Sequence, residues 1–255
     1  MALACALVYL AQAWLAPRMG DVRARTVLLS AWVLHALLAL WSVADHGPRF
    51  GFAPALSVTA WLVVGVYLAD RRLVPQANAR RALALLGAGT VIMAALFPGT
   101  ALHPSASPWM PMHLALGIAS YGLFGAAVTH AWVMMNAERN MRRGVQGDSA
   151  LPLLTLERLT YRFASAGFVL LSATLLAGLL FGEQLYGAGK VWRWDHKSVF
   201  SVLSWAVFAV LLVGRARFGW RGRQAVRFLY FGAILLLLAY VGSRFVIEVV
   251  LGRPL

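Results

Sequence analysis

The residues best suited to chemistry lie in a short polar loop, residues 183–195 (the Trp loop), and in the first turn of the apolar helix that follows. Five fall within six positions, namely Trp192, Trp194, Asp195, His196 and Lys197. Asp195 can cap this helix, because its carboxylate can accept hydrogen bonds from the first-turn amides, and His196 then lies on that turn. A neutral imidazole at a helix end is a good metal ligand. Indole faces suit a flat apolar macrocycle, although tryptophans at a membrane interface also serve as anchors.

The composition indicates a membrane protein. Of the 255 residues, 61% are hydrophobic and 13% are charged, whereas a soluble domain is about half apolar and about a quarter charged. The net charge of +14 does not indicate nucleic-acid binding, because the arginines lie in short turns between apolar runs and form no recognition motif. The single cysteine, Cys5, excludes an intramolecular disulfide and any C-x-x-C motif.

With about 20 apolar residues for each span, the sequence predicts an all-α polytopic membrane protein with eight helices in a single transmembrane domain over residues 1–255. The predicted spans are about 1–17, 26–43, 52–69, 82–97, 111–136, 163–182, 196–214 and 228–251. The first is expected to be a retained helix, because no basic segment precedes its apolar run. The segment LPLLTLERLTYR, residues 151–162, is compatible with a half-buried surface helix or with a basic tether.

The basic residues predict the orientation through the positive-inside rule. Of the 23 Lys and Arg residues, 17 lie in the alternate turns 18–25, 70–81, 138–162 and 215–227, and only 3 lie in the other turns. The rich turns are therefore predicted to be cytoplasmic. Both termini and the Trp loop are then external, which is periplasmic in a Gram-negative cell.

The Trp loop resembles the tryptophan-rich haem-binding loop of the cytochrome c assembly superfamily, in which W-G-x-x-W-x-W-D-x-K precedes a transmembrane helix. Trp192, Trp194, Asp195 and Lys197 match this pattern, whereas Tyr186, His196 and Ser198 replace residues common in the family. Residues 196–251, with their basic GWRGR turn, are similar to the HemX-like and YpjD-like inner-membrane branch, and a weaker similarity covers 113–182. The resemblance implies haem as cofactor, the bacterial inner (cytoplasmic) membrane as location, and a part in cytochrome c assembly or haem handling.

The histidines are sorted by the predicted topology. His113 opens the fifth span and His196 opens the seventh, both from the outside, so this pair is the predicted metal site, as two axial ligands of haem iron. The alternative is that each imidazole bonds a carbonyl or water. His35 lies near the middle of the second span, where an imidazole needs a partner, and it is predicted to contribute to the haem environment. His130 lies at a depth that permits a pair with His35, but its position near a polar helix end favours a side chain that snorkels to the surface.

Cationic residues near the Trp loop are candidates to bind the haem propionates. Lys190, Arg193 and Lys197 could pair with carboxylates in a partly dry site, and the alternative is that they are flanking charges only. Arg244 and Glu248, four residues apart on the last span, are predicted to form an ion pair with a structural or pocket-supporting role.

The predicted function is haem binding and handling without catalysis, with haem held near the periplasmic side by the two histidines and the Trp loop. The chain has no H-E-x-x-H, P-loop or nucleophile-elbow motif. The resemblance implies haem, the lipid bilayer and other cytochrome c assembly or haem-pathway membrane proteins as partners. The alternatives are a small-molecule membrane transporter, for which paired discontinuous helices are expected, and a cofactor-free scaffold for a membrane complex.

Overall fold

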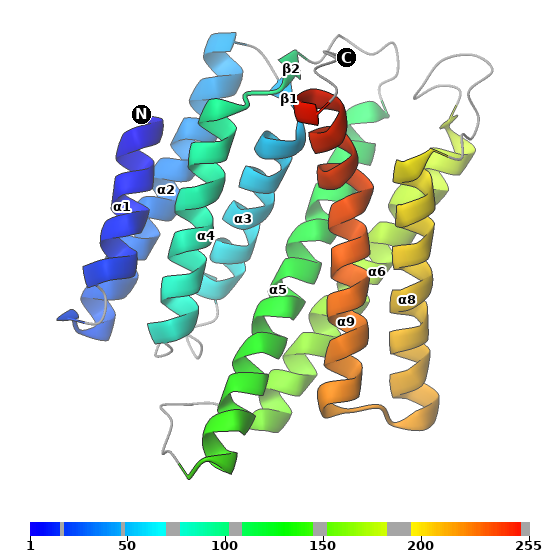
Figure 1. Cartoon of the computed structure of the whole chain (residues 1–255). Coiled ribbons are helices and arrows are strands. Elements are labelled where there is room, and N and C mark those ends of the chain that lie inside the picture. The colour runs from blue at the N-terminus through cyan, green and yellow to red at the C-terminus, as the bar shows by residue number, and fades with distance from the viewer. Residues whose placement is uncertain are drawn as a thin grey trace. The chain divides into compact units, whose positions relative to one another are not determined.

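The computed structural model describes residues 1–15, 18–46, 49–69, 77–101, 109–144, 152–182 and 195–250, which are almost entirely helical (Figure 1). The helices are α1 (Ala2–Leu15), α2 (Asp21–His46), α3 (Phe52–Ala69), α4 (Ala77–Leu96), α5 (Met110–Arg142), α6 (Leu153–Leu180), α8 (His196–Phe218), α9 (Gly222–Leu237), η2 (Leu238–Gly242), α10 (Ser243–Phe245) and η3 (Val246–Val250). The two-residue strands β1 (Arg49–Phe50) and β2 (Thr100–Ala101) pair antiparallel.

The prediction of an all-α polytopic membrane protein is confirmed. Seven helical segments of the described chain are long and apolar enough to cross a membrane. The eighth apolar segment forms α1, which has only 14 residues. At a rise of about 1.5 Å per residue, it is shorter than a typical span of about 20 residues.

Several helices extend beyond the predicted apolar spans into the basic turns. α2 begins at Asp21 where the sequence predicted residue 26, α5 continues to Arg142, and α6 begins at Leu153. Arginine, glutamate and leucine are good helix formers, so the helix continues where hydropathy no longer indicates a span. Most of the segment LPLLTLERLTYR is therefore the first part of α6, and neither a separate surface helix nor a tether.

Contacts divide the chain into two compact units. Unit 1 comprises Met1–Ala101 and Trp132–Leu156, and unit 2 comprises Leu102–Ala131 and Glu157–Leu255. α5 and α6 each contribute residues to both units. The expectation of a single transmembrane domain stays a prediction.

In unit 1, α1 packs against α2 and α4, and α3 packs against α4. The buried ring of Tyr9 lies against Gly87, where an added Cβ would be 2.8 Å from the ring, so the close contact of α1 with α4 requires glycine there. Between α2 and α3, the rings of Trp32 and Trp61 stack with their centroids 4.8 Å apart. Each indole N–H donates to the backbone carbonyl of the other tryptophan, at 2.9 and 3.1 Å, which satisfies both donors where the bilayer offers no water.

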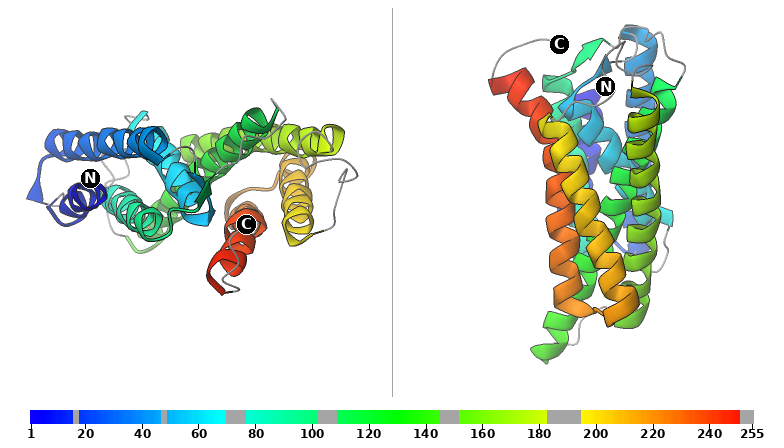
Figure 2. Two further views of the ribbon diagram at one scale, coloured as in Figure 1. Left: turned by 90° about the horizontal axis from the view of Figure 1, so that it is seen from above. Right: turned by 90° about the vertical axis from the view of Figure 1, so that its right-hand side faces the viewer.

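In unit 2, α8 and α9 form an antiparallel hairpin that both views of Figure 2 show side by side. Gly219 ends α8 with a φ of 64°, a left-handed conformation that favours glycine. The buried Ser204 hydroxyl donates to the carbonyl of Gly232 at 2.8 Å. Beside this bond, Phe208 stacks on Phe124 of α5, with the ring centroids 3.7 Å apart. The hairpin is therefore fixed to α5 as well as to itself.

The last apolar helix changes from α-form to π-form near its C-terminal end. η2 follows α9 directly, and η3 follows the three-residue α10. The hydroxyl of Tyr121 on α5 donates to the carbonyl of Leu236, just before η2. A π-turn rotates the side chains that follow it relative to a regular α-helix, and such turns are frequent at functional sites. Tyr240 lies within this π-turn, and Arg244 follows it on α10.

Candidate functional site

Asp195 and His196 begin α8 in the way the sequence predicted. Asp195 has extended backbone angles, φ −89° and ψ 169°, and its Oδ1 accepts the backbone N–H of Ser198 at 2.8 Å. His196 follows as the first residue of the helix, and its side chain is exposed. Within the described residues, the structure records no hydrogen bond or ring contact of this imidazole. The N-cap prediction is confirmed, and the cap fixes the point at which His196 leaves the helix.

His113 lies on the first turn of α5 and is largely buried, with 9% of its surface exposed. Its ring packs against Gly178 of α6, where an added Cβ would be 3.6 Å from His113 Cε1. The charge of Lys197, on the first turn of α8, acts on this imidazole. His113 and Lys197, on different helices, are therefore near enough for their side chains to interact electrostatically.

Tyr240 and Arg244 complete the group of side chains near Lys197. The Lys197 Nζ lies 5.9 Å from the centroid of the Tyr240 ring, and the Arg244 Cζ lies 5.8 Å from the same centroid. One aromatic ring thus lies close to two cations, which is a favourable cation–π arrangement. Two neighbouring cations can also pair with the carboxylates of a ligand.

The sequence reasoning missed Tyr240 and assigned Arg244 a different partner. Glu248, the predicted partner, has a side chain outside the described residues, so that ion pair stays a prediction. Tyr240 lies in η2, and a π-turn has no signature in the hydrophobic period. The sequence offered one indication of the contact between Tyr240 and Arg244. Tyr240 lies four residues before Arg244, and residues i and i+4 are neighbours on a helix surface.

Trp192 and Trp194, with the neighbouring cations Lys190 and Arg193, lie outside the described residues. The predicted roles of the two indoles as walls of the site, and of these cations as partners of propionates, therefore stay predictions. Asp195, which directly follows Trp194, is described and anchors this end of the loop to α8.

His35, in unit 1, has hydrogen-bonding partners for both ring nitrogens. Its Nε2 is joined to the hydroxyl of Ser57 at 2.8 Å, and its Nδ1 to the hydroxyl of Tyr9 at 3.3 Å. His35 and Ser57 line a cavity of about 460 Å³ that Arg49 also lines. The expectation that this imidazole needs a partner in the bilayer is met by protein hydroxyls. Its role near haem stays a prediction, and iron ligation there would require one of these hydrogen bonds to break.

His130 is buried, with 1% of its surface exposed. Its Nδ1 donates to the carbonyl of Ala126 at 2.8 Å, and its ring lies 5.0 Å from that of Phe163. The prediction that this side chain snorkels to the surface is wrong, because packing against α6 holds the ring inside unit 2.

The side-chain types of the site are compatible with haem. Among the residues that the structure describes, no group of three or more His, Cys, Asp or Glu side chains could hold a metal ion. Haem iron needs only one or two protein ligands, because the porphyrin supplies four nitrogens. The imidazoles of His113 and His196 and the cations Lys197 and Arg244 are of the types that haem iron and propionates require. The pairing of the two histidines stays a prediction.

The fold and the site define a polytopic membrane protein. One end of its unit 2 carries imidazole, cationic and aromatic side chains, among them His113, Lys197 and Tyr240. The family described as Cytochrome C assembly protein matches residues 23–251. The inner membrane protein YpjD of Escherichia coli K12 is 33% identical over 152 residues, which cover 58% of this chain and 56% of YpjD. The cytochrome c biogenesis protein CcsA is 26% identical over 88% of this chain and 81% of its own length in Prochlorococcus marinus MIT 9301. In Gloeobacter violaceus it is 25% identical over 96% of this chain and 90% of its own length.

The chain belongs to the cytochrome c assembly protein family. It is a multi-pass protein of the bacterial inner membrane. Its match spans about half the length of YpjD and most of the length of the CcsA proteins.

Proposed function

We propose that this protein binds haem at the end of unit 2 that carries His113, Lys197 and Arg244, and that it takes part in cytochrome c assembly or haem handling. The observation that carries the proposal is the convergence of α5, α8 and the π-helical segment. Lys197 of α8 and Arg244 lie 5.9 and 5.8 Å from the Tyr240 ring centroid, and the charge of Lys197 acts on the buried imidazole of His113 on α5. The names of the CcsA relatives support the biological process.

Each residue has a distinct role in this proposal. His113 and His196 would ligate the haem iron, and Asp195 would orient His196, because it caps the turn that carries this residue. Lys197 and Arg244 would neutralise the propionates, and Trp192 and Trp194 would cover one porphyrin face. Bound haem supplies a redox-active iron, while the protein supplies binding, orientation and the exclusion of water.

The protein acts as a holder of haem and not as an enzyme in this proposal. The work of the chain is to bind the porphyrin tightly enough for transfer to a partner and to keep it at the external surface. The external assignment rests on the 17 basic residues of the alternate turns. Partners are other membrane proteins of cytochrome c assembly or of the haem pathway.

An absorption spectrum of the detergent-purified protein titrated with haem tests the ligand pair. We expect the wild type to show the Soret and α bands of low-spin haem, because two imidazoles complete six-coordinate iron. The double variant His113→Ala with His196→Ala should lose the low-spin bands, and added imidazole should partly restore them. His46→Ala, a histidine in unit 1, is the control and should keep the wild-type spectrum. Unchanged bands in the double variant would show that the ligand assignment is wrong.

A further inference from the structure

One end of unit 2 carries a concentrated positive charge that the proposed haem site does not use. It comprises the beginning of α6 and the turn between α8 and α9, called here the basic face. Its arginines are Arg158, Arg162, Arg215, Arg217, Arg221, Arg223 and Arg227. Among the described residues, Glu157 is the one acidic side chain in these segments.

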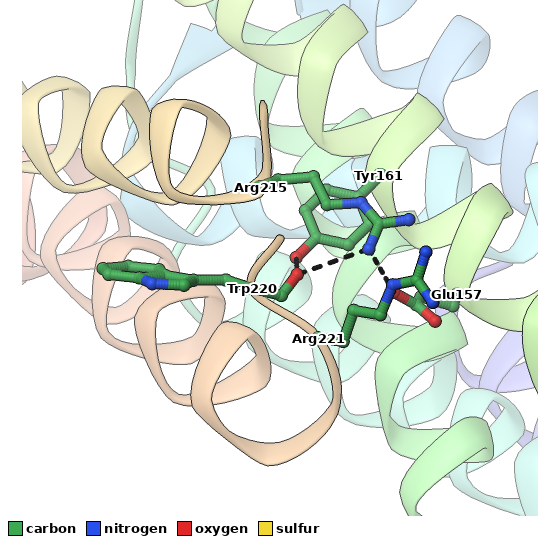
Figure 3. Close-up of polar contacts among 5 residues, drawn as sticks. All are labelled: Glu157, Tyr161, Arg215, Trp220 and Arg221. Atoms are coloured by element: carbon green, nitrogen blue, oxygen red, sulfur yellow. Dashed lines mark hydrogen bonds and ion pairs between the residues drawn. The ribbon is translucent and has the colours of Figure 1, made fainter. Parts of the chain in front are cut away.

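Glu157 is already shared by two of these arginines, as Figure 3 shows. Its Oε1 lies 2.8 Å from Arg215 Nη1 and 3.7 Å from Arg221 Nε. The hydroxyl of Tyr161 donates to the carbonyl of Trp220 at 2.8 Å, and the Arg215 guanidinium lies 4.8 Å from the centroid of the Tyr161 ring. This network fixes the start of α6 to the α8–α9 turn. The other arginines of the basic face lie on these same two segments.

Four of the remaining arginines form two like-charged pairs at i and i+4. Arg158 and Arg162 lie one turn apart on α6, and Arg223 and Arg227 lie one turn apart on α9, all with exposed side chains. Within the described residues, the structure records no acidic partner for any of these four. Like charges at this spacing destabilise a helix. The N-cap of α9, Arg221, makes no side-chain capping bond, so the positive end of the helix dipole adds to the excess. An anion bound here would relieve the repulsion.

The arginine pair of α9 continues into an apolar stripe on the same helix face. From Arg223 and Arg227, steps of four and three residues lead to Phe231, Ile234 and Leu238. Phe231 and Ile234 are 55% and 54% exposed, and Leu238 is exposed as well. A surface that changes from paired cations to exposed apolar side chains matches a molecule with an anionic head and a hydrocarbon tail.

The arginine pair of α6 has a similar continuation. Along the face of Arg158 and Arg162, the next large exposed side chains are Val169, Leu176 and Leu180. Two neighbouring elements of unit 2, joined through Glu157, thus repeat one pattern. Exposed apolar side chains are expected on helices that cross a membrane. Here they follow directly on the arginine pairs, so hydrocarbon and cations lie side by side on one surface.

We propose that the basic face binds the phosphate head group of an anionic phospholipid, with acyl chains lying along the exposed stripe of α9. Arginine suits this role because its planar guanidinium donates two parallel hydrogen bonds to phosphate oxygens. Helices that cross the membrane place such a phosphate level with their basic ends. This inference concerns segments apart from the haem site and does not depend on it.

Lipid binding to the delipidated protein in detergent, counted by native mass spectrometry, tests the proposal. The probes are palmitoyl-oleoyl phosphatidylglycerol, phosphatidylcholine with the same chains, and inorganic phosphate. We expect phosphatidylglycerol to bind in preference to phosphatidylcholine. The variant Arg223→Gln with Arg227→Gln should weaken phosphatidylglycerol binding about thirty-fold, since each cation near an anionic lipid contributes on the order of a factor of five.

A second arginine pair in unit 1 provides the matched control. Arg139 and Arg143 have the same spacing and are exposed, but the same face then reaches Met135, which is only 7% exposed. Arg139→Gln with Arg143→Gln removes the same charge and should leave phosphatidylglycerol binding close to wild type. Arg223→Lys with Arg227→Lys should bind at an intermediate level, because lysine keeps the charge and loses the bidentate geometry.

Three results would overturn the proposal. If Arg223→Gln with Arg227→Gln and Arg139→Gln with Arg143→Gln weaken phosphatidylglycerol binding equally, net charge alone attracts the lipid. If phosphatidylcholine binds as well as phosphatidylglycerol, the acyl chains alone account for lipid binding. Full displacement of phosphatidylglycerol by inorganic phosphate at equal concentration would mean that the site takes free anions. The unfolding temperature without lipid should stay close to wild type in all variants, since the exchanged side chains are exposed.

Discussion

His113 shows how a single small residue determines the setting of a candidate ligand. Gly178 on α6 gives the imidazole of α5 space to lie between the two helices. An added Cβ at residue 178 would be 3.6 Å from the imidazole, which is ordinary van der Waals contact. Alanine therefore fits at this position, whereas a branched side chain would have to displace the ring.

Substitutions at residue 178 should test whether the position of the His113 ring determines haem affinity. We expect Gly178→Leu to lower haem affinity about tenfold or more, because overpacking typically costs about 1–3 kcal/mol and moves the ring. Gly178→Ala is the control and should bind haem nearly as well as the wild type. Haem titrations followed at the Soret band would compare the two. If both variants bind haem with wild-type affinity, His113 does not lie in the haem site.

At the scale of elements, small residues decide which helices approach closely. The α8–α9 hairpin places Gly232 against Phe208, whose ring is also stacked on Phe124. An added Cβ at 232 would lie 2.7 Å from the Phe208 ring, and the stack on Phe124 restricts the movement of that ring. Gly89 on α4 is also helical, and an added Cβ there would have no atom within 4 Å.

These two glycines should respond in opposite ways to the same substitution. Gly232→Ala should reduce the free energy of unfolding by about 1–3 kcal/mol, because an overpacked core shifts both helices. Gly89→Ala should leave stability unchanged or raise it by up to about 1 kcal/mol, since alanine is the better helix former. Thermal unfolding in detergent would measure both. A loss at Gly89 as large as that at Gly232 would contradict the packing explanation.

At the scale of the whole molecule, the distribution of arginines predicts the orientation in the membrane. The 17 basic residues of the alternate turns should remain cytoplasmic, which leaves the Trp loop outside. The native thiol of Cys5 is buried, with 2% of its surface exposed, so it contributes little background to thiol labelling. Single introduced cysteines can therefore report on each side.

Labelling with a membrane-impermeant maleimide should distinguish the two sides. In intact spheroplasts, we expect Ala188→Cys in the Trp loop to react, because that loop is predicted to be external. Ser149→Cys in the connector between α5 and α6 should react only after lysis, and the unsubstituted protein is the control for Cys5. The reverse pattern would contradict the predicted orientation and would move the proposed haem site to the cytoplasmic side.

Local properties of the sequence determined a large part of this protein. Hydropathy located the seven helices long enough to cross a membrane, because burial in lipid requires about 20 apolar residues in one run. It also predicted an eighth span where the structure has the shorter α1. The Asp195 cap could be predicted because the carboxylate and the amide that it accepts are only three residues apart. The helix ends in the basic turns could not be predicted from hydropathy. Polar helix formers continue α2, α5 and α6 beyond the apolar runs.

Only the tertiary structure decided which side chains meet. Lys197 reaches Tyr240, His35 bonds Ser57, and Glu157 pairs with Arg215 across separations that no local pattern encodes. Such contacts depend on the rotation of each helix about its axis. That rotation is set by packing against neighbours, at positions such as Gly87 and Gly232, and by the π-turn before Arg244. The sequence alone therefore predicted the candidate ligands, while the packing of the helices decided the partners that surround them.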